Sequence, residues 1–585
     1  MHGVTPKLQW VAVGMVALVV ATALPRLFAR VFDSNFYELA ASIQDDSFYY
    51  LLPAFHFKSK LFFTFDGVGP SYGFQPTYAL FLTGLAFFYS DFESFFRGAM
   101  FMGVGLHVLT SLMVTLLVVR IVDAKASWLR WVQCGLAAAA GLFYFTRGTV
   151  LYSVMTCKEN SLASALFVGV LLLATSRPST ERGRRWLSIG VGSALAALLL
   201  CRLLPTTLGI LSLVGLVVLM RWRKPVALLA SFALPIIAWG TYATLAFGHP
   251  LPTSVRVKAL RHSVPVTWEI ISTKGVEYLT GAFKFAMGLP GQMWVPQYDV
   301  GQVVLPSRQG SLWLALGFVV VAVLVVAAVQ GVLKARRERV SLLEGVPFMV
   351  GMLALLAAGV CLAYVAQGSL IWTRRPGEFT YYIWYFFDLP VVVALSLGLA
   401  AVYGVSMLEG AVERLRARSG GVVPGALVAS LGGVLALLAV SVLIARVPRE
   451  YGKLSALKPY ETFREVTESW SHNMMRSGMW LKNNVQLQPG DRVACFSCGA
   501  LGMILPGHVL NLDGLANDEA ARYLLGQSMT IEQYVDKVRP HYYIDVHTSH
   551  INHNPRVLVK QLQLLPFYYE PQQGYLTAEL SYPQP

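Results

Sequence analysis

Two adjacent carboxylates, Asp45 and Asp46, lie among aromatic residues just after the first long apolar segment, residues 8–28. A third acid, Asp66, follows in the same stretch. Removing a carboxylate from water costs free energy, so acids in such surroundings point to a chemical use. A carboxylate can take the proton of an attacking hydroxyl group. The pattern therefore predicts that residues 44–78 form the active-site loop of a membrane enzyme.

A structural explanation of the same acids is also open. Apolar residues follow them at helical spacing, which predicts an amphipathic helix that lies along the membrane interface: Phe48, Leu51, Leu52 and Phe55. Asp45 could cap this helix, and Asp46 would sit in its favourable first turn. Adjacent helical positions diverge by about 100°. We therefore expect one of the two carboxylates to face the pocket.

Composition places the chain in a membrane. It has 585 residues, of which 55% are hydrophobic and 14% charged, and this excludes an ordinary water-soluble globule. The net charge of +15 suggests Lys and Arg in cytoplasmic loops rather than binding to nucleic acid. The sequence predicts a polytopic membrane protein whose partners include the lipid bilayer.

Apolar runs predict about eleven membrane-spanning helices. They cover residues 8–28, 98–119, 132–145, 161–174, 187–200, 204–220, 225–247, 311–333, 343–366, 382–405 and 422–445. The short apolar run 77–89 is expected outside the membrane, because Lys and Arg then gather consistently in alternate loops. This places the N-terminus in the cytoplasm, with the first segment as a retained anchor.

The remaining segments are expected on the outer face. They are a first outer loop, residues 29–97, a second long loop, residues 248–310, and the tail, residues 446–585. Strand-like segments at 492–497, 508–513 and 542–546 alternate with helix-like segments at 518–525 and 531–538. We expect an all-α membrane domain, residues 1–445, followed by a small extracytoplasmic α/β domain formed by the tail.

Three motifs of the first outer loop carry a family resemblance. Asp45-Asp-Ser-Phe-Tyr-Tyr, Thr64-Phe-Asp-Gly and Gly73-Phe-Gln-Pro resemble the first-loop motifs of the GT-C superfamily of integral-membrane glycosyltransferases. The chain most resembles a bacterial branch that is similar to the mycobacterial terminal arabinofuranosyltransferases and related to protein mannosyltransferases. Gln75 departs from the pattern, since this branch usually has His there.

The resemblance implies a polyprenyl-phosphate sugar donor and an active site that faces away from the cytoplasm, in a bacterial inner (plasma) membrane. It implies that Asp45 is the base toward the acceptor hydroxyl, with Asp46 as the second choice. Glu159 resembles a second-loop acid, the segment 248–258 a donor-side loop, and Asn511-Leu-Asp-Gly-Leu a tail motif. Asp66 and Gln75, as members of the first-loop motifs, are expected to contact substrate.

A departing lipid phosphate needs cations. Five basic residues lie in or beside outer loops, where the charge bias depletes them: Arg202, Arg256, Lys258, Arg374 and Arg375. Arg suits bidentate phosphate contacts, so we expect this group to bind the donor. Each of them could instead contact lipid headgroups or snorkel to the interface.

No cofactor is expected, and a metal-independent enzyme is favoured because no clear Asp-x-Asp pair is present. Glu159 could still serve as a second carboxylate for a divalent metal. Cys495 and Cys498 could form a redox motif, half of a zinc site or a disulfide, and a structural role is favoured. The scattered histidines of the tail are expected in a solvated loop.

These features predict a glycosyltransferase that moves a sugar from a polyprenyl-phosphate donor to a cell-envelope glycan, lipid or protein. A transporter or flippase of lipid-linked sugars is the alternative, but it predicts two related halves with broken helices, and no internal symmetry is visible. A glycan polymerase or ligase would concentrate Arg and His in later outer loops. The first-loop acids favour the transferase.

Overall fold

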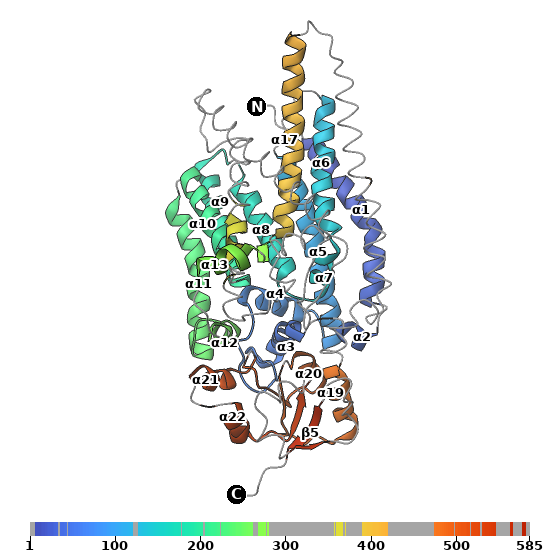
Figure 1. The fold of residues 1–585 in the computed structure, drawn as a ribbon, viewed down its shortest axis with the longest axis vertical. Helices are drawn as coiled ribbons and strands as arrows, with labels where there is room; N and C mark the ends of the chain where they lie inside the picture. The colour runs from blue at the N-terminus through green and yellow to red at the C-terminus, as the bar shows by residue number, and fades with distance from the viewer. Residues whose placement is uncertain are drawn as a thin grey trace.

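The computed structural model in Figure 1 shows long helices stacked above a small mixed sheet with its own helices. The structure describes residues 6–32, 35–41, 43, 45–120, 127–176, 178–202, 205–222, 224–260, 267–276, 278–279, 356, 359–366, 369, 389–418, 441, 473–496, 498–514, 516–526, 529, 531–545, 562–564 and 576–580.

Five helices in these described ranges contain a segment long and apolar enough to cross a membrane. They are α1 (Pro6–Phe32), α5 (Phe92–Val119), α9 (Glu181–Cys201), α11 (Pro225–Phe247) and α17 (Leu389–Arg418). Three shorter helices match expected spans: α6 (Ser127–Phe145), α8 (Asn160–Ala174) and α10 (Pro205–Trp222). The expected spans 311–333, 343–366 and 422–445 fall largely outside the described residues, so the total of about eleven stays a prediction.

Local signals set several helix ends. Asp91 caps α5 by accepting a hydrogen bond from the Ser94 N–H at 2.8 Å, so α5 starts inside the segment 29–97 that the sequence assigned to the first outer loop. Thr180 caps α9 in the same way through the Gly183 N–H. Helix α11 ends at Gly248, whose φ of 81° is left-handed, a conformation that glycine adopts without strain.

The segment 29–97, which the sequence predicts as the first outer loop, contains three short helices, α2 (Phe36–Ala41), α3 (Asp45–Lys60) and α4 (Pro76–Ala86). Residues 47–54 of α3 are all buried, so its apolar stripe packs inside the protein, and its position along the membrane interface stays a prediction. Helix α3 packs against α4 on one side and against helix α20 (Gly499–Ile504) of the tail on another. Tertiary contacts therefore cover both the apolar stripe and the face that carries Asp45.

The described part of the tail holds a five-stranded sheet in the order β2-β1-β3-β5-β4. The strands are β1 (Val493–Cys495), β2 (Val509–Asn511), β3 (Tyr542–Asp545), β4 (Leu562–Leu564) and β5 (Leu576–Leu580). Strand β1 is parallel to β2 and β3, and β5 is antiparallel to β3 and β4. The helices are α19 (Asn473–Asn484), α20 (Gly499–Ile504), α21 (Asp518–Gly526) and α22 (Ile531–Val538). Three strands and two helices occur where the sequence predicted them.

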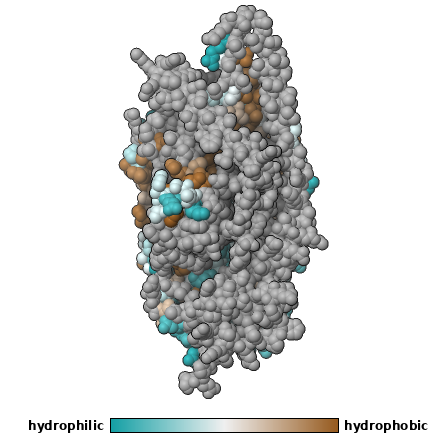
Figure 2. Space-filling model, viewed as in Figure 1, coloured by the Kyte–Doolittle hydropathy of each residue, from teal (hydrophilic) through white to brown (hydrophobic). Residues whose placement is uncertain are grey.

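The remaining described helices are α7 (Gly148–Met155), α12 (Thr253–Leu260), the short α13 (Trp268–Ile270) and the π-helix η1 (Ile271–Gly275). One apolar core joins α3 to the tail, since Phe48 and Leu52 belong to the same cluster as Leu501 and Ile504. Figure 2 shows hydrophobic residues on the side where α11 lies and hydrophilic residues lower down, toward the tail. Exposed side chains of α11 such as Val226 and Leu245 are suited to lipid contact.

Candidate functional site

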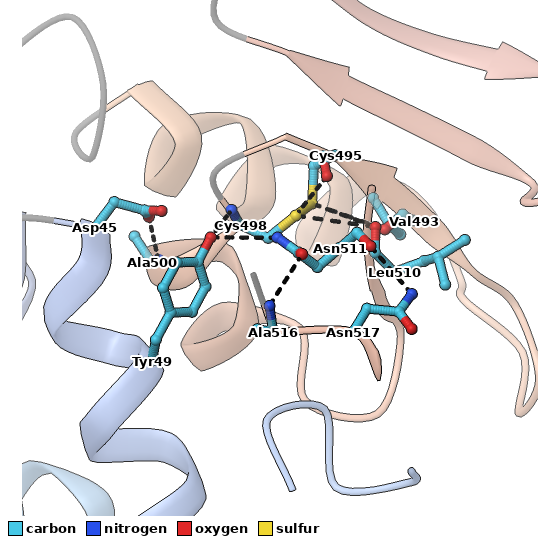
Figure 3. The surroundings of a disulfide bond; sticks show 10 residues. All are labelled: Asp45, Tyr49, Val493, Cys495, Cys498, Ala500, Leu510, Asn511, Ala516 and Asn517. Carbon is cyan, nitrogen blue, oxygen red and sulfur yellow. Dashed lines mark hydrogen bonds between the residues drawn. A yellow bond between two sulfur atoms is a disulfide. The ribbon is translucent and has the colours of Figure 1, made fainter. Parts of the chain in front are cut away.

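The face of α3 that carries Asp45 and Tyr49 meets the tail (Figure 3). Oδ1 of Asp45 accepts a hydrogen bond from the Ala500 N–H at 2.9 Å. The hydroxyl oxygen of Tyr49 accepts one from the Cys498 N–H at 3.0 Å and one from Nδ2 of Asn511 at 3.2 Å. Asp45 and Tyr49 are four residues apart, so they share one face of the helix. That whole face is therefore fixed by residues distant in sequence.

The close approach of the tail depends on Gly499. A Cβ atom on this residue would lie 2.7 Å from Oδ1 of Asp45 and even closer to the Asp45 backbone, so no larger residue fits without a shift. A disulfide between Cys495 and Cys498 closes the turn directly before Gly499. Of the roles that the sequence left open for the two cysteines, the structure shows the disulfide. Within the described ranges, His, Cys, Asp and Glu form no group of three that could hold a metal ion.

Burial dominates the electrostatics of Asp45. It raises the pKa of the carboxyl group from 3.8 to about 8, against the opposing effect of the Ala500 and Gly499 N–H groups, while Asp46 and Asp513 raise the pKa further. Its Oδ2 atom is buried and has no hydrogen-bond partner among the described residues. One oxygen of this carboxyl group is therefore held in place, and the other is left to take or give a proton.

The next face of α3 carries Asp46 and Tyr50 and meets two ion pairs. Oδ2 of Asp46 lies 3.3 Å from Nζ of Lys158, whose side chain is 1% exposed against 38% for Asp46. Arg202 pairs with Glu159, and both side chains are 4% exposed. Burial raises the pKa of the Tyr50 hydroxyl, while Arg202 lowers it and Asp46 raises it further, so the charges of both residues act on the same hydroxyl group. This face gathers two buried cations beside a half-exposed carboxylate.

The backbone before Lys158 is held in a rare conformation. Cys157 lies between α7 and α8 and has a φ of 53°, in the left-handed region that non-glycine residues seldom adopt. Glu159 stands at the N-terminal end of α8 and Arg202 at the C-terminal end of α9. Strained backbone of this kind persists where the surrounding structure enforces it, which occurs often at functional sites.

Asp66 organises its own loop. Its Oδ1 accepts hydrogen bonds from the Thr64 hydroxyl and from the N–H groups of Val68 and Gly69, at 2.9 to 3.0 Å. Its Oδ2 lies 3.8 Å from Nη1 of Arg492 in the tail. These contacts shape a turn and join it to the tail, and a contact with substrate stays a prediction.

Gln75 directly precedes α4, and its side chain makes no capping hydrogen bond to that helix. Its role in binding stays a prediction, as do those of the expected donor-side cations. Arg256 is half-buried on α12, and Lys258 lies on the same helix. The side chain of Lys258 and the whole of Arg374 and Arg375 lie outside the described residues.

The donor-side segment is joined to both the first loop and the tail. The Thr253 hydroxyl donates a hydrogen bond to the Asp518 carboxylate, and the Thr253 N–H donates to the Tyr72 carbonyl oxygen at 2.7 Å. The Tyr72 hydroxyl donates to the Pro250 carbonyl oxygen at 3.2 Å. Burial raises the pKa of Asp518, which is 5% exposed. Three parts of the chain thus meet at Thr253.

Sequence reasoning missed Lys158, Tyr49 and Asp518 as parts of the site. The signal for Lys158 was a cation directly before the acid Glu159 in an apolar context. The signal for Tyr49 was its spacing, since Tyr49 and Tyr50 repeat the adjacent acids four residues later. Nothing in the sequence around Asp518 marks it.

Comparisons with known proteins agree with this architecture at the level of the fold. Residues 464–580 match a family described as a domain of unknown function, DUF8728. No characterised protein matches the chain by sequence. The solved structure of ArnT from Cupriavidus metallidurans bound to undecaprenyl phosphate is similar with a TM-score of 0.55 and 11% identity, over 98% of this chain and 99% of that one. The apo state of ArnT has a TM-score of 0.47 and 13% identity, over 98% of this chain and 100% of that chain. The likeness to the lipid-bound structure shows a shared fold.

Proposed function

We propose that this protein is a glycosyltransferase that moves a sugar from a polyprenyl-phosphate donor to an extracytoplasmic acceptor of the cell envelope. The supporting observation is the two-sided arrangement of α3. Its Asp45 face carries a carboxyl oxygen without a partner among the described residues, and its Asp46 face meets the cations Lys158 and Arg202. A displacement at a sugar carbon needs a base on one side and a stabilised leaving group on the other.

The cation face is the proposed donor side. Lys158 and Arg202 are almost fully buried, and buried cations are retained at a cost unless they are paired or used. In the proposed complex the donor phosphate approaches these two residues, and Asp46 and Glu159 hold them in place. ArnT, which shares the fold, was solved with bound undecaprenyl phosphate, and this supports a polyprenyl-phosphate lipid as the donor.

The tail-facing side is the proposed acceptor side. Oδ2 of Asp45 takes the proton of the acceptor hydroxyl while the acceptor oxygen bonds to the anomeric carbon. The bond from that carbon to the phosphate oxygen breaks, and the polyprenyl phosphate leaves with the electron pair and its negative charge. A base whose pKa is near 8 combines a useful ionised fraction with a strong tendency to take the proton. Attack opposite the leaving group inverts the anomeric configuration.

The proposed enzyme is metal-independent and lies in a bacterial plasma membrane, with its N-terminus in the cytoplasm and its tail outside. The disulfide of the tail supports this orientation, because disulfides persist in oxidising, extracytoplasmic compartments. The arabinofuranosyltransferase-like branch of the first-loop motifs makes a furanose donor a suitable first choice.

The test is sugar transfer by purified protein from a panel of polyprenyl-phosphate sugars, with wild type beside Asp45→Asn and Asp46→Asn at matched folded amounts. Transfer by wild type that collapses in Asp45→Asn, with a smaller loss and weaker donor binding in Asp46→Asn, supports the assignment. Donor binding without transfer by wild type, followed by movement of the lipid across vesicles, would favour the transporter instead.

A further inference from the structure

Cys498, Gly499 and Ala500 form a turn of the tail that contacts the proposed base and the neighbouring Tyr49, and the disulfide to Cys495 closes it. We propose that this disulfide-closed turn is a positioning element of the active site, which holds Asp45 and Tyr49 so that Oδ2 of Asp45 is presented to the acceptor. The inference rests on the proposed function. It adds to it that the tail takes part in the chemistry by fixing the base.

Groups of the tail donate three hydrogen bonds to two residues of α3. The Ala500 N–H holds the carboxyl of Asp45, and the Cys498 N–H and the Asn511 side chain hold the hydroxyl of Tyr49. Because the two α3 residues lie one helical turn apart, the contacts restrain both the rotation and the position of the helix. A base must be within hydrogen-bond reach of the proton it takes, so such restraint acts directly on the rate.

Helix α20 packs so closely against α3 and Phe65 that a Cβ atom at either of two positions of α20 would require a neighbouring group to shift. A Cβ atom on Gly502 would lie 2.7 Å from Cζ of Phe65 and 2.9 Å from Cδ1 of Leu52, and one on Gly499 would meet Asp45. The two glycines are three residues apart and share one face of the helix. Because neither glycine has a side chain, the Ala500 N–H comes within hydrogen-bond distance of the Asp45 carboxylate.

The disulfide fixes the position of the groups that donate these hydrogen bonds. Cys498 provides the N–H that holds Tyr49 and directly precedes α20, and its bond to Cys495 ties this point to strand β1. Asn511, which also holds Tyr49, lies on the neighbouring strand β2. The sheet therefore holds the hydrogen-bond donors of the tail on a rigid support. Rigid elements place a site more accurately than loops do.

The surroundings of Asp45 leave a single oxygen for chemistry. Oδ1 is engaged by the tail, whereas Oδ2 is buried without a hydrogen-bond partner among the described residues. The charged groups that act on the carboxyl are Asp46 on α3 itself and Asp513 on the tail. Both disfavour its ionised form, which strengthens the base once it is ionised. A hydrogen bond to Oδ1 orients the carboxyl group so that Oδ2 can react, as the bases of other catalytic sites are oriented by a third group.

Gly499→Ala is the sharpest test, because the added methyl group pushes the tail from Asp45 and leaves the first loop unchanged in sequence. Its matched control is Gly84→Ala on the exposed face of α4, where an added Cβ meets nothing within 4 Å. We expect kcat of Gly499→Ala to fall roughly 10²-fold with little change in the donor KM, since small misplacements can cost that much. The control should keep the wild-type kcat.

The pH profile separates positioning from a loss of folded enzyme. Burial is the largest cause of the high pKa of Asp45, so admitting water between tail and α3 should lower that pKa. The acid limb of kcat/KM should therefore move to lower pH in Gly499→Ala. If a variant preparation only contains a smaller fraction of folded enzyme, its apparent kcat/KM falls by the same factor at every pH.

Two further variants keep the proposal open to refutation if Gly499→Ala does not fold. Tyr49→Phe removes one hydroxyl at constant shape, and the double variant Cys495→Ser/Cys498→Ser removes the brace. Both should lower kcat and speed hydrogen exchange in residues 45–52. Wild-type kcat, pH profile and exchange in the variants that fold would overturn the proposal while leaving the transferase intact. If wild type transfers no sugar, the proposed function fails, and hydrogen exchange alone then tells whether the turn holds α3.

Discussion

Tyr49 and Asn511 are separated by 462 positions in the chain, yet Nδ2 of Asn511 donates a hydrogen bond to the Tyr49 hydroxyl oxygen at 3.2 Å. This contact links the first-loop helix to the sheet of the tail. It lies one helical turn from Asp45, so a change in the tail is felt at the proposed base. The predictions below use this coupling and the two faces of α3.

Asp45→Asn should alter how stability depends on pH. The folded protein binds a proton on Asp45 between the unfolded pKa of 3.8 and the folded pKa of about 8, and the unfolded chain does not. Its contribution to the free energy of unfolding is therefore complete below pH 4 and is lost as pH rises toward 8. Asn keeps an oxygen for the Ala500 N–H and has no charge to bury.

Thermal unfolding in detergent at pH 5 and pH 8 measures this effect. Asp45→Asn should gain stability relative to wild type on going to pH 8. Asp536→Asn, which removes an exposed carboxyl group on α22, is the control and should show no such gain. Equal pH slopes for wild type and Asp45→Asn would contradict the buried, protonated state of Asp45.

Glu159→Gln should destabilise the protein strongly. It leaves the Arg202 guanidinium without its buried counter-charge, a change that typically costs about 3–5 kcal/mol. The double variant Glu159→Leu/Arg202→Met replaces the pair by apolar groups and should recover most of that loss, because no uncompensated charge stays buried. Unfolding in denaturant is the measurement. A double variant as unstable as Glu159→Gln would show that the pair is needed for folding itself.

Much of the scaffold could be predicted from the sequence, because long apolar runs specify helices regardless of tertiary contacts. Residues 225–247, for example, form α11 with the expected bounds. The position of α3 could not be predicted, since the groups that cover it, such as Ala500 and Lys158, lie far away in the chain. The sequence did indicate that the adjacent acids diverge. What each acid faces depends on the docking of the tail.

Lys158→Met should impair donor binding more than folding. The substitution keeps an unbranched side chain in a buried position and removes the cation proposed to meet the donor phosphate. Asp46, which is partly exposed, can regain contact with water, so the cost in stability should stay below that of Glu159→Gln. We expect the donor KM to rise about 10-fold or more, in keeping with the loss of a charge-assisted contact of about 1.5–3 kcal/mol.

The control for this variant is Lys60→Met, which removes an exposed cation from the far end of α3. Its donor KM should equal that of wild type. An unchanged donor KM in Lys158→Met, measured with folded protein, would assign Lys158 to structure and move the phosphate site elsewhere.

Variants in the turn around Asp66 can distinguish a structural role of Asp66 from a role in binding substrate. Asp66→Asn keeps the Oδ1 acceptor for its three hydrogen bonds, whereas Asp66→Ala removes it and should cost about 1–3 kcal/mol of stability. Gly67→Ala should cost about 1–2 kcal/mol, because Gly67 has a φ of 80°. Gly69→Ala, where an added Cβ meets nothing within 4 Å, is the control.

If Asp66 acts through the turn, Asp66→Asn transfers sugar at nearly the wild-type rate with an unchanged donor KM. Both Asp66→Ala and Gly67→Ala then lower the unfolding temperature. A donor KM that rises sharply in Asp66→Asn, at unchanged stability, would instead place this carboxylate against the substrate, as the first-loop motif predicted.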